Sequence, residues 1–196
     1  MIRRLGSKKK ATDDPSTATD EQLMDLLKAG HRPSGGILFD RYHVKLYQFF
    51  WRMCQDRSLS EDLTQVTFER LLRYRSSYQS GQSVRTWLYQ IARHAAYDHF
   101  KKNKLRISDF TEADDLGQAD PNHRLEDADQ KAQLREAMKQ LRPELREVLI
   151  LTRYQGMRYQ EAAQILDCSE GAVKVRVHRA IKELRTVFFN LENQSS

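Results

Sequence analysis

Hydrophobic residues recur at steps of three and four along most of this chain, which is the spacing of one face of an α-helix. The longest such pattern starts at Ile37 and continues through Leu38, Tyr42, Leu46, Phe49 and Met53. The same spacing predicts helices over residues 21–29, 60–75, 84–102, 134–141, 159–166 and 170–188, with one more opened by Pro143. Since no convincing strand pattern interrupts them, we predict an all-α fold.

Short polar residues and glycine mark the expected ends of these helices. Asp20 and Ser60 are candidate N-caps, because their side chains can accept hydrogen bonds from the free amides of a first helical turn. Gly30 is a candidate stop signal, and Asp167–Ser169 is the expected tight turn between two helices.

The helical patterns fall into two blocks, so we predict two small helical domains joined by a flexible acidic linker. The expected parts are a mobile tail at 1–20, a domain at 21–102, the linker at 103–130, a second domain at 131–190 and a tail at 191–196. The first 102 residues hold 18 Lys and Arg against 11 Asp and Glu, the linker 3 against 8, and residues 131–196 hold 12 against 8. Two basic blocks suit a polyanion such as nucleic acid, but charge alone favours the simpler explanation of solvated charged helices.

Composition excludes several classes of protein. No apolar run among the 196 residues approaches the ~18 residues of a membrane span, and the basic start MIRRLGSKKK lacks the apolar stretch of a signal peptide. We therefore expect an intracellular protein without membrane insertion. The two cysteines, Cys54 and Cys168, are too few for a disulfide framework and lack ligand-spaced partners for zinc.

The strongest candidate for chemistry is the C-terminal pair of helices, whose lengths match a helix-turn-helix. On the second helix, steps of 100° direct Val173, Val177, Ala180 and Leu184 toward a core. The opposite side is basic and carries small groups, as a helix that enters a DNA major groove requires. The alternative is an ordinary helical hairpin with a solvated basic face.

Two further patterns are ambiguous by themselves. Arg85, Tyr89, Arg93, Tyr97 and Lys101 recur every four residues, and interleaved cations and aromatics suit single-stranded nucleic acid. The tyrosines could instead edge the core. The polar face formed by Asp62, Gln65 and Glu69 suits a basic protein partner, or it simply keeps the helix soluble.

Four segments in this order resemble the extracytoplasmic-function (ECF) group of bacterial RNA polymerase sigma factors. The segments are LFDRYHVKLYQFFWRMCQD, LSEDLTQVTFERLLRY, SVRTWLYQIARHAAYDHFKK and LRPELREVLILTRYQGMRYQEAAQILDCSEGAVKVRVHRAIKELR. They cover roughly residues 21–102 and 131–188, which correspond to sigma region 2 and sigma region 4. The resemblance implies a subunit that binds core RNA polymerase, directs it to specific promoters and helps to melt the DNA.

The resemblance also implies a role for particular side chains. The helix with Asp62, Gln65, Phe68 and Glu69 would dock on the polymerase. The loop from Tyr78 to Val84 and the following helix would hold a flipped base of the melted non-template strand, using Tyr78, Ser83, Arg85, Trp87, Arg93, His94, Tyr97 and Lys101. Trp87 is expected to support this loop. The upstream promoter duplex would be contacted by Lys174, Val175, Arg176, His178 and Arg179.

The chain departs from the family pattern at three places. His94 stands where asparagine is usual, which affects the expected base preference. The sequence RPSGG at 32–36 predicts a more flexible connection between the first two helices. Asp167 stands where glycine is common, but aspartate tolerates a left-handed turn, so we expect the turn to form.

We predict no catalytic residues, no metal and no cofactor, since phosphate-loop, HExxH and GxSxG motifs are absent from the sequence. The expected location is the cytoplasm, at the nucleoid. An anti-sigma partner is common in the group, and nothing in the sequence proves one here. One alternative is a dimeric helix-turn-helix regulator of duplex DNA, and another is a nucleic-acid-processing enzyme, which would need clustered carboxylates or a metal site.

Overall fold

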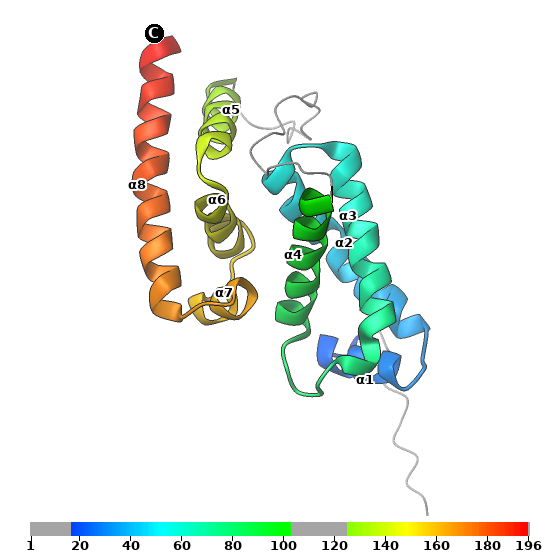
Figure 1. Ribbon diagram of the computed structural model, residues 1–196. Coiled ribbons are helices and arrows are strands. Elements are labelled where there is room, and N and C mark those ends of the chain that lie inside the picture. The colour runs from blue at the N-terminus through cyan, green and yellow to red at the C-terminus, as the bar shows by residue number, and fades with distance from the viewer. Residues whose placement is uncertain (1–16, 103–124, 196) are drawn as a thin grey trace, which may run out of the picture.

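A computed structural model describes residues 17–102 and 125–195, and every regular element in these ranges is a helix (Figure 1). The first half contains α1 (Asp20–Lys28), α2 (Pro33–Cys54), α3 (Arg57–Tyr74), the 3₁₀-helix η2 (Arg75–Ser77) and α4 (Val84–Lys102). The second half contains α5 (Leu125–Gln140), α6 (Pro143–Leu149), the π-helix η4 (Ile150–Tyr154), α7 (Tyr159–Leu166) and α8 (Glu170–Ser195). The expected all-α fold is confirmed for the described residues, whereas residues 1–16 of the predicted tail and 103–124 of the predicted linker lie outside them. Two expected bounds are wrong: Asp20 begins α1 and is not part of a tail, and α5 begins at Leu125, inside the predicted linker, because the helix continues before the apolar face that starts at Leu134.

The core of the first half forms where the predicted apolar faces of α2, α3 and α4 meet. Leu38, Leu46 and Phe49 of α2 are completely buried, as is Leu88 of α4. Burying such side chains contributes roughly 1.5–3 kcal/mol each, so this face dominates the stability of the bundle. The periodicity that predicted the faces is therefore confirmed.

The connection between α1 and α2 is shorter than the sequence suggested. Helix α2 begins at Pro33, so Ser34 to Gly36 are helical, and the expected flexible loop at RPSGG is wrong. Proline suits the first helical turn because it lacks the amide that would go unbonded there. At Gly35 an added Cβ would lie 3.3 Å from Leu27 and 3.4 Å from Leu72. The missing side chain of Gly35 thus allows both α1 and α3 to pack closely against α2.

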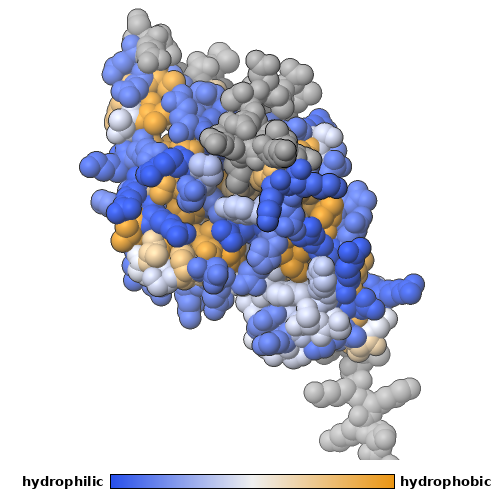
Figure 2. Space-filling view, in the orientation of Figure 1, coloured by the Kyte–Doolittle hydropathy of each residue, from blue (hydrophilic) through white to orange (hydrophobic). Residues whose placement is uncertain are grey.

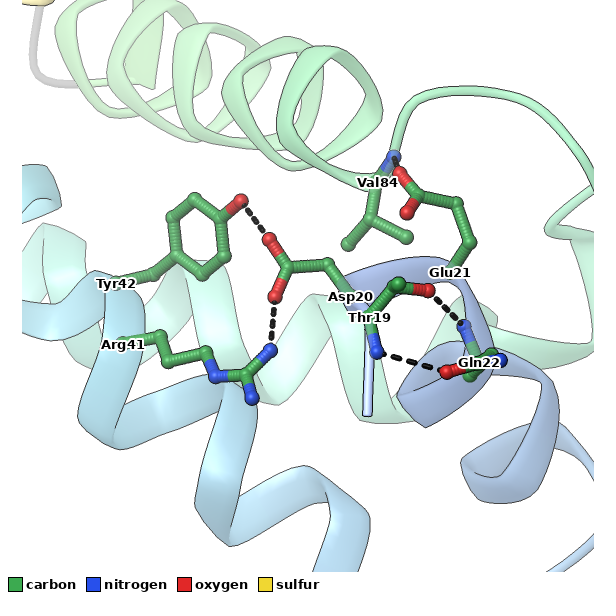
Figure 3. Close-up of polar contacts among 7 residues, drawn as sticks. All are labelled: Thr19, Asp20, Glu21, Gln22, Arg41, Tyr42 and Val84. Carbon is green, nitrogen blue, oxygen red and sulfur yellow. Dashed lines mark hydrogen bonds and ion pairs between the residues drawn. The ribbon is translucent and has the colours of Figure 1, made fainter. Parts of the chain in front are cut away.

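Two of the expected helix caps are wrong. Thr19, not Asp20, caps α1: its hydroxyl accepts from the Gln22 amide, and the Gln22 side chain accepts from the Thr19 amide (Figure 3). Asp20 instead forms an ion pair with Arg41 at 2.6 Å and accepts a hydrogen bond from Tyr42.

The cap of α3 also lies one turn before the expected Ser60. Asp56 accepts a hydrogen bond from the Leu59 amide at 2.9 Å, whereas Ser60 is buried inside the helix and donates to the Asp56 carbonyl. Helix α3 therefore starts at Arg57, and only Gln55 and Asp56 separate it from the end of α2.

In the second half, α7 and α8 form the predicted helical pair, and α8 extends beyond the expected end at residue 188. Asp167 adopts the left-handed conformation with φ 51°, so the expected turn forms without glycine. Ser169 then accepts a hydrogen bond from the Ala172 amide and fixes the start of α8. No helix among the described residues is long and apolar enough to cross a membrane.

Candidate nucleic-acid interface

Helix α8 carries an exposed basic face. Val173, Val177 and Ala180 are buried against the rest of the second half, as the 100° steps predicted. The side chains on the opposite side are Lys174, Val175, His178 and Arg179, all exposed, with Arg176 partly exposed beside them. Lys174 forms an ion pair with Glu170 at 2.9 Å, but an exposed pair of this kind is weak and can yield to a phosphate.

Helix α3 carries a separate acidic and polar face. Asp62, Gln65 and Glu69 are exposed or partly exposed, and the Gln65 amide donates to Glu69 at 3.3 Å. Phe68 is almost buried and packs against Phe39 of α2, with the ring centroids 4.8 Å apart. Phe39 itself is 42% exposed. This face therefore combines carboxylates with an exposed aromatic ring.

The stripe predicted along α4 is only partly exposed. His94 and Lys101 are exposed, but Tyr89 is completely buried and donates to the Gln155 side chain at 2.6 Å. Arg93 donates to the Glu147 carboxylate at 3.0 Å, and Tyr97 donates to the same carboxylate at 3.3 Å. Much of the stripe therefore contacts α6 and the segment after η4. Figure 1 shows α4 on the side of the first half that faces α6 and α7.

Glu147 is the charged centre of this contact. Its side chain is 2% exposed, and burial raises the pKa of its carboxyl, although Arg93 and Tyr97 oppose that shift. Burial disfavours the charge of Arg93, but Glu147 and Tyr97 together outweigh it and raise the Arg93 pKa. The Arg93 guanidinium also lies 4.7 Å from the centre of the Tyr97 ring, a cation–π contact. Removing the Arg93 charge would leave the Glu147 carboxylate buried without its ionic partner.

Gln155 makes the other main contact between the halves. Its carbonyl accepts from Arg85, and its side-chain amide donates to the Lys45 carbonyl at 3.3 Å. It directly follows the π-helix, an irregularity common at functional positions.

Three further pairs join the halves away from Gln155 and Glu147. Arg146 donates to the Met53 carbonyl at 3.0 Å, and Gln90 donates to the Gln164 carbonyl at 3.0 Å. Arg52 lies 4.6 Å from the centre of the Tyr154 ring. The two halves therefore form a contact rich in hydrogen bonds.

The loop between η2 and α4 is ordered by its own side chains. Tyr78 is 1% exposed, donates to the Gln82 carbonyl at 2.6 Å and packs on Trp87 with ring centroids 5.3 Å apart. Ser83 accepts from the Thr86 amide at 3.2 Å and so caps α4. Trp87 supports the loop as expected, whereas the Tyr78 ring lies beneath the surface.

An apolar groove lies between α5 and α8, near the C-terminal end of α8. It is lined by Leu134, Leu184, Phe188 and Phe189, with Lys131 and Arg185 at its edges. Figure 2 shows hydrophobic surface at this end of the molecule, among mainly hydrophilic surroundings. The groove depends on how α5 and α8 pack, so no local sequence pattern predicts it.

Comparison with known proteins identifies the family. Residues 38–106 match Sigma-70 region 2, and residues 131–184 match Sigma-70 region 4. The chain is 35% identical to the ECF RNA polymerase sigma factor SigX of Bacillus subtilis over 156 residues, which cover 76% of this chain and 80% of SigX. The chain belongs to the ECF RNA polymerase sigma factors. As such it binds core RNA polymerase and promoter DNA in transcription initiation.

Two solved structures show the same fold as this sigma factor. CnrH, in complex with the cytosolic domain of CnrY, has a TM-score of 0.69 at 23% identity, covering 87% of this chain and 97% of CnrH. RpoE of Bartonella quintana, in complex with the anti-sigma factor NepR, has a TM-score of 0.64 at 24% identity, covering 76% of this chain and 92% of RpoE.

The region 2 match of this sigma factor starts at Leu38, so α1 lies before it. Within the described residues, no three His, Cys, Asp or Glu side chains are grouped as ligands for a metal ion. Sequence reasoning missed Glu147, Gln155 and Phe39, because their importance comes from partners on other helices. The local signal was the position of Glu147 directly before the apolar run from Val148 to Leu151.

Proposed function

We propose that three surfaces of this sigma factor divide its work in transcription initiation. The α8 face (Lys174, Val175, Arg176, His178 and Arg179) contacts the upstream promoter element as duplex DNA. The α3 face (Asp62, Gln65, Phe68 and Glu69) docks on core RNA polymerase. The observation that supports this division is the separation of an exposed basic face on one half from an exposed acidic face on the other.

In this proposal the loop and α4 hold the melted non-template strand. Ser83, His94 and Lys101 are accessible without any rearrangement, whereas Arg85, Arg93 and Tyr97 can meet DNA only after leaving Gln155 and Glu147. Tyr78 and Tyr89 are buried and act by supporting this surface. Extruding a base costs a few kcal/mol of stacking, which the loop and its neighbours must offset.

The proposal assigns functional units to the predicted boundaries: residues 21–102 bind polymerase and the downstream element, and residues 131–190 bind the upstream element. The protein acts in the cytoplasm, at the nucleoid, and is not itself an enzyme. Since the structural neighbours CnrH and RpoE were solved with protein partners, one of them an anti-sigma factor, a regulator of that class is a candidate partner here.

The decisive experiment is transcription in vitro with core polymerase free of other sigma factors, on fragmented DNA from the source organism. We expect discrete transcripts that start at new sites only when this protein is added, and their start sites would identify the promoter. Sequence-specific duplex binding by the protein alone, without any transcript, would instead support the helix-turn-helix regulator. Metal-dependent cleavage of the DNA would support the processing enzyme.

A further inference from the structure

One side of α1 reaches the loop that precedes α4. Glu21, Asp25 and Lys28 are spaced by four and three residues, so they lie on one face of the helix. Each of the three side chains contacts a different point of the segment from Tyr78 to Val84. Their contacts therefore follow the loop from its first residue to the start of the next helix.

The three contacts are all hydrogen bonds. The Lys28 ammonium donates to the Tyr78 carbonyl at 2.7 Å. The Ser80 hydroxyl donates to the Asp25 carboxylate at 2.6 Å. The Val84 amide donates to the Glu21 carboxylate at 3.3 Å, which places a negative charge at the start of α4 (Figure 3).

The loop between these contacts also has bonds of its own, and the Tyr78 hydroxyl donates to the Gln82 carbonyl at 2.6 Å. The Gln82 amide donates to the Gln79 carbonyl at 3.1 Å, and Gly81 adopts the left-handed region at φ 93°, which suits glycine. Gln79, Ser80 and Gly81 remain exposed. Helix α1 thus contacts one side of the loop, and the loop tip, residues 79–81, stays accessible to a ligand.

Helix α1 is itself firmly attached to the first half, independently of these loop contacts. Leu23 and Met24 are completely buried, and Leu27 is 2% exposed. Asp20 adds its bonds to Arg41 and Tyr42 (Figure 3). Asp25 and Lys28, in contrast, are exposed at the surface. Their loop contacts can therefore be removed without detaching the helix.

We propose that Asp25 and Lys28 are positioning residues that set the shape of the loop from Tyr78 to Ser83, and thereby its choice of base in the melted strand. This inference rests on the proposed role of that loop. A preformed loop discriminates between bases better than a mobile one, because a mobile loop can adapt to each of them. The residues act through the loop and touch neither polymerase nor upstream duplex.

The test uses two double variants. The Ala/Met variant combines Asp25→Ala and Lys28→Met and removes both contacts. The conservative variant combines Asp25→Asn and Lys28→Arg and keeps an acceptor and a donor. The first measurement is hydrogen exchange of the loop amides in the full-length protein. We expect several-fold faster exchange at residues 79–84 in the Ala/Met variant, unchanged exchange in α2 and α3, and near-normal exchange in the conservative variant.

The second measurement uses the reconstituted holoenzyme on the promoter found by transcription in vitro, with each of the four bases placed in turn at every position of the downstream element. We expect the Ala/Met variant to lose about fivefold in base discrimination there, roughly the factor that one hydrogen bond contributes. Affinity for core polymerase and discrimination in the upstream element should not change, and the conservative variant should restore the downstream discrimination.

Unchanged exchange in the loop, or unchanged downstream discrimination, would overturn the inference. Equal losses in both promoter elements would also overturn it, since they would indicate a general loss of structure. If the wild-type holoenzyme does not discriminate bases in the downstream element, the proposed role of the loop fails. Hydrogen exchange would still decide separately whether α1 holds the loop.

Discussion

At the scale of single residues, exposure separates side chains that can meet DNA directly from those that support them. Val175 is 49% exposed on the α8 face, whereas Tyr78 and Tyr89 are almost completely buried. A tyrosine in a stripe with arginines is compatible with base stacking, but a buried ring has no free face on which a base can stack. Tyr78 and Tyr89 therefore act mainly through packing.

The first prediction concerns the two proposed binding faces. Lys174→Ala with Arg179→Ala should weaken binding to promoter duplex, by about 1–3 kcal/mol for each side chain that binds a base and by less for one that binds a phosphate. Asp62→Ala with Gln65→Ala should weaken binding to core polymerase and leave duplex binding intact. Both affinities are measured for both variants at one salt concentration. Equal loss of the same activity in the two variants would refute the division.

The second prediction concerns pH, because burial raises the pKa of Tyr42, Tyr89 and Tyr97 above the usual 10 and that of Tyr78 to about 12. The unfolded chain releases these protons first as the pH rises above about 10. The free energy of unfolding should therefore be unaffected by these groups below pH 10 and should fall as the pH rises above it. Ultraviolet absorbance of tyrosinate, together with denaturation at each pH, measures both effects. Ionisation of all tyrosines near pH 10, while the protein is still folded, would contradict the prediction.

At the scale of the elements, helix positions follow from periodicity and helix ends from single hydrogen bonds. The ranges of α4 and α7 agree with the expected ones, because their apolar faces are clear and their ends carry strong local signals. The starts of α1, α2 and α3 differ by one to four residues from expectation. At α1 and α3, a second polar residue nearby provides the cap in place of the expected one. At α2, glycine is tolerated within the first turns because side chains of neighbouring helices pack closely against it.

The third prediction tests the corrected cap of α3. Asp56→Ala removes the bond to the Leu59 amide and should lower the free energy of unfolding by about 0.5–2 kcal/mol. Ser58→Ala is the matched control, since Ser58 is exposed in the same turn and its replacement should have little effect. Chemical denaturation measures both variants. An equal and small effect of the two substitutions would show that Asp56 contributes no cap.

At the scale of the whole molecule, the packing of the two halves covers part of the surface that is proposed to bind melted DNA. Arg93 and Tyr97 share the buried carboxylate of Glu147, and Arg85 bonds to the carbonyl of Gln155. A strand of DNA that uses these side chains must first replace those contacts. The arrangement of the halves therefore affects how readily the stripe binds DNA.

The fourth prediction follows from that competition. Glu147→Gln removes the charge shared by Arg93 and Tyr97, and Gln155→Ala removes the side-chain bonds to Tyr89 and to the Lys45 carbonyl but keeps the backbone carbonyl that Arg85 contacts. Both changes lie in the second half, so the α4 side chains stay native. We expect a larger mean separation of the halves, measured by energy transfer between dyes, and about tenfold tighter binding of a single-stranded oligonucleotide, as for the removal of one or two hydrogen bonds. Arg57→Ala, at an exposed ion pair with Glu61, is the control and should change neither quantity. Unchanged separation and affinity in the double variant would show that these contacts do not cover the stripe.

The sequence by itself determined the helices, their buried faces and the two exposed polar faces on α3 and α8 that are proposed to bind. These properties depend on residues within a few turns of one another, and a repeat of 3.6 residues is visible without knowing any distant partner. The family motifs are also local segments. For the same reason the turn at Asp167 could be predicted from one residue and its neighbours.

Only the tertiary structure decided which polar side chains are buried and what they bind. Glu147 meets Arg93 across 54 positions, Lys28 meets the Tyr78 carbonyl across 50, and Gln155 meets Tyr89 across 66. Such pairs depend on which helix surfaces come together, and a buried polar group must find a partner wherever packing places one. The exposure of the α4 stripe and the contacts of α1 with the preceding loop therefore depend on tertiary packing.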